Sequence, residues 1–134
     1  MFLYLLNETE GRAFMELAVQ AMKLNGRKED CTRAEYETYL AELDLLDFEP
    51  AGLSVSDAAD AFDSSSVAVK RSVIIELCGI LYSDKEIDEE ETKWIYDLSG
   101  RFGLTESETG RLVRWSKDFS DFLEIGLMYI NAES

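Results

Sequence analysis

The sequence predicts an all-α protein: a single domain of about six or seven helices, built from two related helix-loop-helix units. Apolar residues recur at intervals of three and four along most of the chain, the period of a helix with one buried face. Residues that favour helix starts are repeatedly followed, three positions later, by Asp or Glu, the pattern of a capping box. No segment shows the sustained alternation of a strand. The chain has 134 residues, of which 46% are apolar, and this fits one domain with one core over residues 1–134.

The N-terminal part contains two predicted helices. The first is capped by Asn7, which has an acid three residues later, and it ends at Asn25-Gly26. Its inward stripe comprises Phe14, Leu17, Ala18, Ala21, Met22 and Leu24. The second is capped by Thr32 with Glu35. Its inward stripe comprises Tyr36, Tyr39, Leu40 and Leu43.

A connector of about residues 46–66 separates the two halves of the chain. It contains the single proline, Pro50, and a serine cluster at residues 64–66. Ser54 with Asp57 predicts a short helix that runs as far as Phe62. We therefore expect a connector with one or two helical turns.

Four more helices are predicted after the connector. Ser66 caps one over about residues 67–82, and this helix is apolar around most of its circumference, which places it at the centre. Asp88 caps the next, whose inward residues are Trp94, Ile95, Leu98 and Phe102. Thr105 caps another, which carries Leu112, Val113 and Trp115. A last helix, about residues 119–130, has an inner stripe of Phe119, Phe122, Leu123, Gly126, Leu127 and Ile130.

An internal repeat relates residues 16–45 to residues 76–104. Both segments open with Glu-Leu, pass through a polar loop, start a capped helix and end on an apolar residue, one spacer and leucine. One gap in the loop aligns them. We expect the two helix-loop-helix units to pack about a pseudo-twofold axis, each covering the apolar face of the other.

The second unit carries a family resemblance, in the phrase ELCGILYSDKEIDEEETKWIYDLSGRFGLTESE. It resembles the TerB-like, tellurite-resistance-associated helical domain, whose second half reads as an apolar helix, an Asp-Gly-Glu loop, an acidic helix start and a closing phrase like GLSEEE. Two departures stand out: Lys85 replaces the glycine, and Asn25-Gly26-Arg27 replaces Asp-Gly-Glu in the first half. The resemblance implies an all-helical domain linked to stress or tellurite resistance, and no known reaction.

The acidic run from residue 84 to residue 91 is the candidate metal site. The proposed ligands are Asp84, Glu86, Asp88 and Glu91, which fall on the acidic positions of the TerB-like family. Carboxylate ligands suit Ca²⁺ or Mg²⁺. An EF-hand does not fit, because Glu89 and Ile95 occupy the positions of its glycine and its last glutamate. The alternative is that these carboxylates only open a helix, where the helix dipole favours them.

The residue types argue against an enzyme. The chain has no histidine, the commonest general base and transition-metal ligand. Cys31 and Cys78 have no histidine or lysine arranged to activate them. We expect a non-catalytic binding or adaptor module without catalytic residues, with a weak Ca²⁺ or Mg²⁺ site as its one cofactor hypothesis. Two alternatives stay open: a carboxylate-metal-dependent enzyme acting on a phosphorylated substrate, and an oligomeric structural subunit.

The charge distribution bears on the partners. The net charge is −15, and residues 34–69 contain nine acids and no base. Such a surface repels phosphate backbones, so we expect no nucleic-acid binding. A basic patch of Arg111, Arg114 and Lys117 predicts docking of an acidic surface, with helix-terminal charge as the alternative. A second apolar face of Ile125, Met128 and Tyr129 predicts a homodimer contact or a peptide-docking face, unless the domain itself covers it.

We also expect a cytoplasmic protein that does not insert into membranes. The apolar N-terminus, residues 1–6, lacks the length and the basic flank of a signal peptide. No run approaches the ~20 apolar residues that span a bilayer. Two cysteines 47 positions apart do not form a disulfide framework, so we predict that both are reduced.

Overall fold

The computed structural model describes residues 1–26, 29–82 and 87–132, with the side chains of residues 29–32 left outside the description. Within these ranges the chain forms six α-helices, one short 3₁₀ helix at Leu3–Leu5 and no strand, and 76% of the chain is helical. This confirms the predicted all-α fold class.

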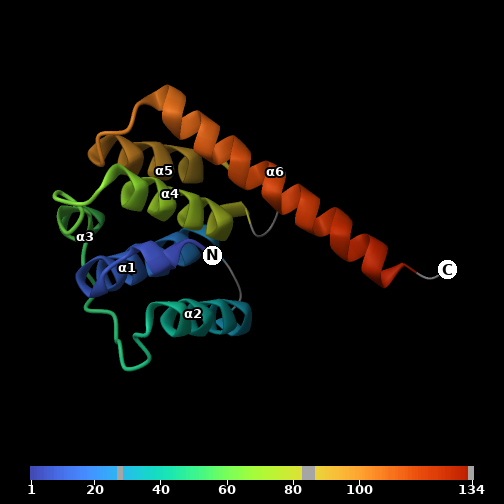
Figure 1. The fold of residues 1–134 in the computed structure, drawn as a ribbon, viewed down its shortest axis with the longest axis horizontal. Coiled ribbons are helices and arrows are strands. Elements are labelled where there is room, and N and C mark those ends of the chain that lie inside the picture. Colours follow the sequence, from blue (N-terminus) through green and yellow to red (C-terminus); the bar gives the residue numbers. More distant parts are fainter. Residues whose placement is uncertain (27–28, 83–86, 133–134) are drawn as a thin grey trace.

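Helices α1 and α4 form the centre of the protein (Figure 1). α1, Glu8–Asn25, starts with the predicted capping box: the Asn7 side chain accepts a hydrogen bond from the backbone N–H of Glu10 at 2.8 Å. It ends at Gly26, whose φ of 69° lies in the left-handed region that glycine adopts without strain. α4, Val67–Leu81, is capped by Ser66 and is buried on most sides, as predicted for a central helix.

Helices α2 and α5 flank this centre. α2, Glu29–Leu43, packs against α1, and α5, Glu89–Arg101, packs against α4. The predicted cap at Thr32 is wrong, because α2 starts three residues earlier and Thr32 lies within its helical span. Glu29 and Asp30 are residue types that the helix dipole favours in a first turn, and the cap pattern alone did not weigh them.

The connector is ordered by two buried glutamates of α1. The Glu16 carboxylate accepts backbone N–H bonds from Ala51, Gly52 and Leu53 at 2.7–3.0 Å, and Glu10 accepts the hydroxyl of Ser65. The predicted short helix is present as α3, Val55–Asp60, which is capped by Ser54. The connector is therefore held to the core through its backbone.

The last two predicted helices are one continuous helix. α6 runs over Glu106–Asn131, 26 residues, from the predicted cap at Thr105. The predicted break before Phe119 is wrong, because Ser116-Lys117-Asp118 contains no glycine or proline to interrupt the helical hydrogen bonds. At 1.5 Å per residue the helix is about 39 Å long.

The second half of α6 extends beyond the rest of the protein (Figure 1). We call residues 118–131 the α6 arm and residues 1–117 the body. The predicted inner stripe of this segment is wrong: Phe119, Phe122, Leu123, Leu127 and Ile130 are 39–78% exposed instead of packed. Phe119 still lines a groove with residues of α2 and α4, and beyond it the helix extends past the body.

The predicted repeat falls on two helix pairs, α1 with α2 and α4 with α5. The aligned glutamates, Glu16 and Glu76, are both buried and both accept backbone N–H bonds. Glu76 accepts from Phe2 at 2.8 Å. A pseudo-twofold relation between the two units stays a prediction.

Candidate functional site

Of the four proposed metal ligands in the acidic run, two cap a helix and two lie outside the described residues. Asp84 and Glu86 lie outside the described residues. Asp88 accepts the backbone N–H of Glu91 at 2.7 Å, and Glu91 accepts the backbone N–H of Asp88 at 3.4 Å. These two carboxylates therefore form the capping box of α5, as the alternative to a metal site predicts.

Glu91 has a second structural contact. Its side chain is buried, and the amide of Asn25 donates to it at 3.0 Å and to the backbone carbonyl of Leu81 at 3.1 Å. The end of α1 is thereby joined to the end of α4 and the start of α5. Among the described residues, no group of three or more His, Cys, Asp or Glu side chains is placed to hold a metal ion.

The Cys78 thiol is buried in the core. Burial raises its pKa to about 12, so it stays protonated and unreactive near neutral pH. The side chain of Cys31 is not among those described. The predicted reduced state of the two cysteines stays a prediction.

The basic patch lies on the outer side of the first half of α6. Arg111, Arg114 and Lys117 are all exposed. Arg101, at the end of α5, does not belong to this patch. Its guanidinium forms ion pairs with Asp63, at 2.7 Å, and with Asp60. Hydrogen bonding from Arg101 lowers the pKa of Asp63.

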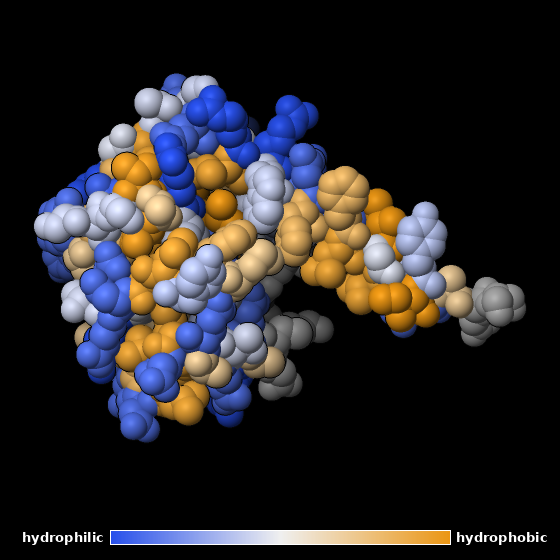
Figure 2. Space-filling model, in the orientation of Figure 1, coloured by the Kyte–Doolittle hydropathy of each residue, from blue (hydrophilic) through white to orange (hydrophobic). Residues whose placement is uncertain are grey.

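The α6 arm carries a cluster of exposed apolar side chains. Seven large side chains are 46–80% exposed: Phe122, Leu123, Ile125, Leu127, Met128, Tyr129 and Ile130. Figure 2 shows apolar side chains gathered along the arm. Three of them, Ile125, Met128 and Tyr129, were predicted as a partner surface, whereas the others were assigned to the core.

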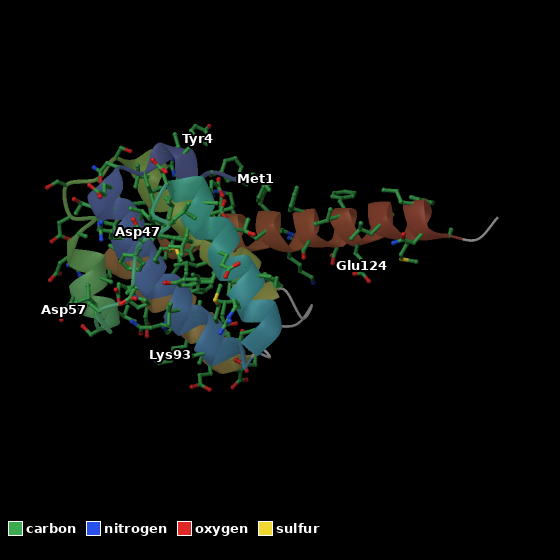
Figure 3. The ribbon with its side chains drawn as sticks, turned by 90° about the horizontal axis from the view of Figure 1, so that it is seen from below. Met1, Tyr4, Asp47, Asp57, Lys93 and Glu124 are labelled. Carbon is green, nitrogen blue, oxygen red and sulfur yellow. The ribbon has the colours of Figure 1, made fainter. Side chains whose placement is uncertain are left out.

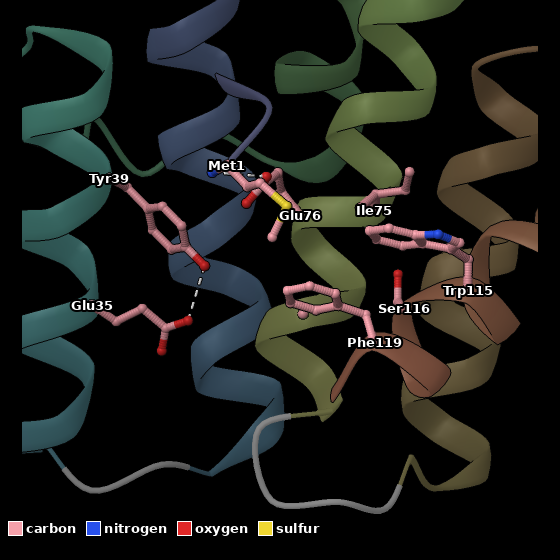
Figure 4. Close-up of a pocket in the computed structure, with 9 residues that line it drawn as sticks. Met1, Glu35, Tyr39, Ile75, Glu76, Trp115, Ser116 and Phe119 are labelled. Carbon is pink, nitrogen blue, oxygen red and sulfur yellow. Dashed lines mark hydrogen bonds and ion pairs between the residues drawn. The ribbon is translucent and has the colours of Figure 1, made fainter. Parts of the chain in front are cut away.

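A groove lies where α6 leaves the body. It has a volume of about 170 Å³, and its walls include Tyr39 from α2, Ile75 from α4, and Trp115 and Phe119 from α6 (Figure 4). Trp115 stacks on Phe119 with ring centroids 5.4 Å apart, and the ring centroid of Phe2 lies 6.0 Å from that of Trp115. Since Trp115 and Phe119 are about 40% exposed, an aromatic surface runs from the body onto the arm.

The sequence contained a signal for the exposed arm that the inner-stripe prediction ignored. At 100° per residue, the seven apolar side chains point around most of the helix. Packing against one side of the helix therefore cannot bury all seven side chains. None of the described helices is long and apolar enough to cross a membrane.

No family model, curated protein or solved structure matches this chain. The candidate surface is therefore argued from its own residues.

Proposed function

We propose that this protein is a non-catalytic binding module that docks a protein partner through the α6 arm. One observation carries the proposal: the arm stands clear of the body in Figures 1 and 3 and exposes seven large apolar side chains. A helix that is hydrophobic around its circumference is normally buried on all sides. Monomeric proteins rarely expose continuous apolar patches beyond a few hundred Å².

The energetics of an isolated helix support the same conclusion. A helical segment shorter than about 12–15 residues is marginally stable in water, and most helices depend on packing of an apolar face. The arm contains Gly126, which costs about 1 kcal/mol relative to alanine in a helix interior, and the β-branched Ile125 and Ile130, whose helix propensity is slightly reduced. A partner that covers the arm would supply the missing packing.

The wider setting is proposed from the residue types and the family resemblance. We propose a cytoplasmic protein of TerB-like type, linked to stress or tellurite resistance. The buried, protonated Cys78 and the absence of histidine support a non-catalytic role. A weak Ca²⁺ or Mg²⁺ site on residues 84–91 stays a hypothesis, and it depends on Asp84 and Glu86 because Asp88 and Glu91 already cap α5.

Photo-crosslinking from the arm tests the docking proposal. A photoreactive phenylalanine analogue replaces Tyr129, which is 80% exposed, and in a matched control it replaces Tyr4 on the body, which is 73% exposed. Irradiation in cells should give one discrete protein adduct from position 129 and none from position 4. The adduct should disappear when Phe122→Ser is added. Equal, diffuse labelling from both positions would contradict the proposal.

The cation hypothesis has its own test. Asp84→Asn with Glu86→Gln removes two carboxylates that are not predicted caps. We expect Ca²⁺ or Mg²⁺ to raise the Tm of the unmodified protein only at about millimolar concentrations, by mass action, and the double variant to lose that rise. Monovalent salt at matched ionic strength is the control, because screening alone relieves repulsion among the carboxylates. If the metal affinity is unchanged in the double variant, Asp84 and Glu86 do not form the site and the hypothesis is wrong.

A further inference from the structure

Along α6, three basic residues are followed by three acidic residues. A role in binding through apolar side chains does not by itself require this order. The first half of the helix carries Arg111, Arg114 and Lys117 and no acid between them. The arm carries Asp118, Asp121 and Glu124 and no base after Lys117. Successive charges of one sign are three residues apart, which places neighbours on one broad face of the helix. The midpoint of the pattern lies between residues 117 and 118.

We infer that the partner of the arm is a second copy of this chain, with the two α6 helices packed antiparallel about a twofold axis between residues 117 and 118. This inference rests on the proposed function and names its partner. Reversal about that midpoint places residue 114 opposite residue 121 and residue 117 opposite residue 118. Arg114 then meets Asp121 of the other copy, and Lys117 meets Asp118, so twofold symmetry makes each pair twice.

Charge excludes the two simplest competing arrangements. A parallel pair in register would stack bases on bases and acids on acids, which is destabilising. An antiparallel pair through the arms alone would bring together residues 118–131 of both copies, which contain acids and no base. Between chains of net charge −15, association needs local complementarity, and the 117/118 register provides it.

The same register covers part of the apolar surface of the arm. Each arm lies along the first half of the other copy's α6, on the exposed side that carries Arg111, Arg114 and Lys117. At 100° per residue, Ile125, Met128 and Tyr129 lie on the same face of α6 as the charges that form the pairs, so these are the arm residues that the second helix covers.

Charge reversal tests the register. Sedimentation equilibrium is measured for Arg114→Glu, for Asp121→Arg and for the double variant. We expect a dimer, about tenfold or more weaker in either single variant because like charges then meet twice, and restored to within about threefold in the double variant. Asp121→Arg is the informative single change, because it lowers the net negative charge and would strengthen any non-specific association.

The matched control is an exposed charge pair inside α5. Lys93 and Asp97 form a 2.8 Å ion pair and are 77% and 66% exposed. Lys93→Glu, Asp97→Arg and their combination make the same charge changes away from α6. We expect each to leave the dissociation constant within about twofold of the original, because surface pairs contribute little and these lie outside the proposed interface.

Cysteine crosslinking tests the axis directly, with Cys31→Ser as background. Asp118→Cys should form a disulfide with residue 118 of the other copy. Along the direction of the helix axes, the two residues lie within about 2 Å of each other. Tyr129→Cys should not, because its two copies lie about 35 Å apart along that direction. A Tyr129→Cys crosslink without an Asp118→Cys crosslink would overturn the inference.

Three further results would overturn the inference, and the first two separate it from the proposed function. If the chain is monomeric at all concentrations and the adduct at position 129 contains another protein, the self-pairing fails and the binding arm stands. If the chain is monomeric, gives no adduct and instead binds phosphatidylcholine vesicles, both fail. A dimer whose double charge reversal does not recover would also overturn the register.

Discussion

The body and the α6 arm use the same residue types in opposite surroundings. Phe14 and Phe62 in the body are completely buried, whereas Phe122 in the arm is 72% exposed. Both regions are mainly helical, and helices in both contain apolar residues at intervals of three and four. The comparison shows that periodicity specifies a helix and the direction of its apolar side chains, while burial depends on whether another element lies there to receive them.

The acidic side chains differ between the two regions in the same way. In the body, Glu10, Glu16 and Glu76 are buried and hold backbone or hydroxyl groups of distant segments. In the arm, Asp118 and Asp121 lie at the surface. The body uses carboxylates to join parts of the fold, and the arm presents them outward.

The largest expected effect comes from removing one phenylalanine in each region. Phe62→Ala should lower the free energy of unfolding by about 3–5 kcal/mol, because it leaves a cavity among buried side chains. Phe122→Ala should change it by less than about 0.5 kcal/mol, because the ring is mostly solvated in the monomer. Urea denaturation of dilute, monomeric protein measures both. Equal losses would mean that the arm folds back onto the body in solution.

A smaller effect is expected from neutralising one acid in each region. Glu16→Gln replaces one acceptor oxygen by an amide that cannot accept the N–H groups of residues 51–53, so we expect a loss of about 1–3 kcal/mol. Asp121→Asn should stay within about 0.5 kcal/mol in the monomer. Thermal denaturation of both variants and of the unmodified protein under the same conditions measures the two stability changes. A neutral Glu16→Gln would show that the connector is held by something other than this carboxylate.

Amide hydrogen exchange should separate the two regions without any substitution. In the monomer, we expect amides of residues 119–131 to exchange about 100-fold faster or more than those of α4, because a helix end without packing opens locally at little cost. Raising the concentration should slow the arm and leave α4 unchanged if a second copy covers it. Equal protection in dilute protein would contradict the distinction between body and arm.

The smallest expected effect is the pH dependence of an ion pair on the surface of the body. Arg101 lowers the pKa of Asp63 in the folded state. The stabilisation is therefore present above the unfolded-state pKa, about 3.9 for an aspartate, and it is lost as pH falls through the folded-state value. The Tm difference between the unmodified protein and Asp63→Asn should be largest near pH 7 and vanish at low pH. An Arg101→Leu background should abolish this dependence.

The helix starts could be predicted from the sequence because caps are local. Asn7, Ser54, Ser66, Asp88 and Thr105 each accept the backbone N–H three residues later, as expected. The apolar circumference of α4 likewise predicted its central position. The cap at Thr32 failed for a local reason: the pattern fitted, but an acidic first turn lay just ahead of it.

Within the part of the chain that the structure describes, only the tertiary structure decided what the helices pack against. The sequence of α6 determined a helix with apolar residues around it, three bases followed by three acids, and no break at residues 116–118. It did not determine where the body ends beneath that helix, because this depends on α4 and α5, which are distant in sequence. Likewise, Glu16 could be placed on α1 from its spacing, but its role depends on three N–H groups 35–37 residues away. Local hydrogen bonds are encoded within one helical turn, whereas burial and long-range acceptance arise only when separate elements pack together.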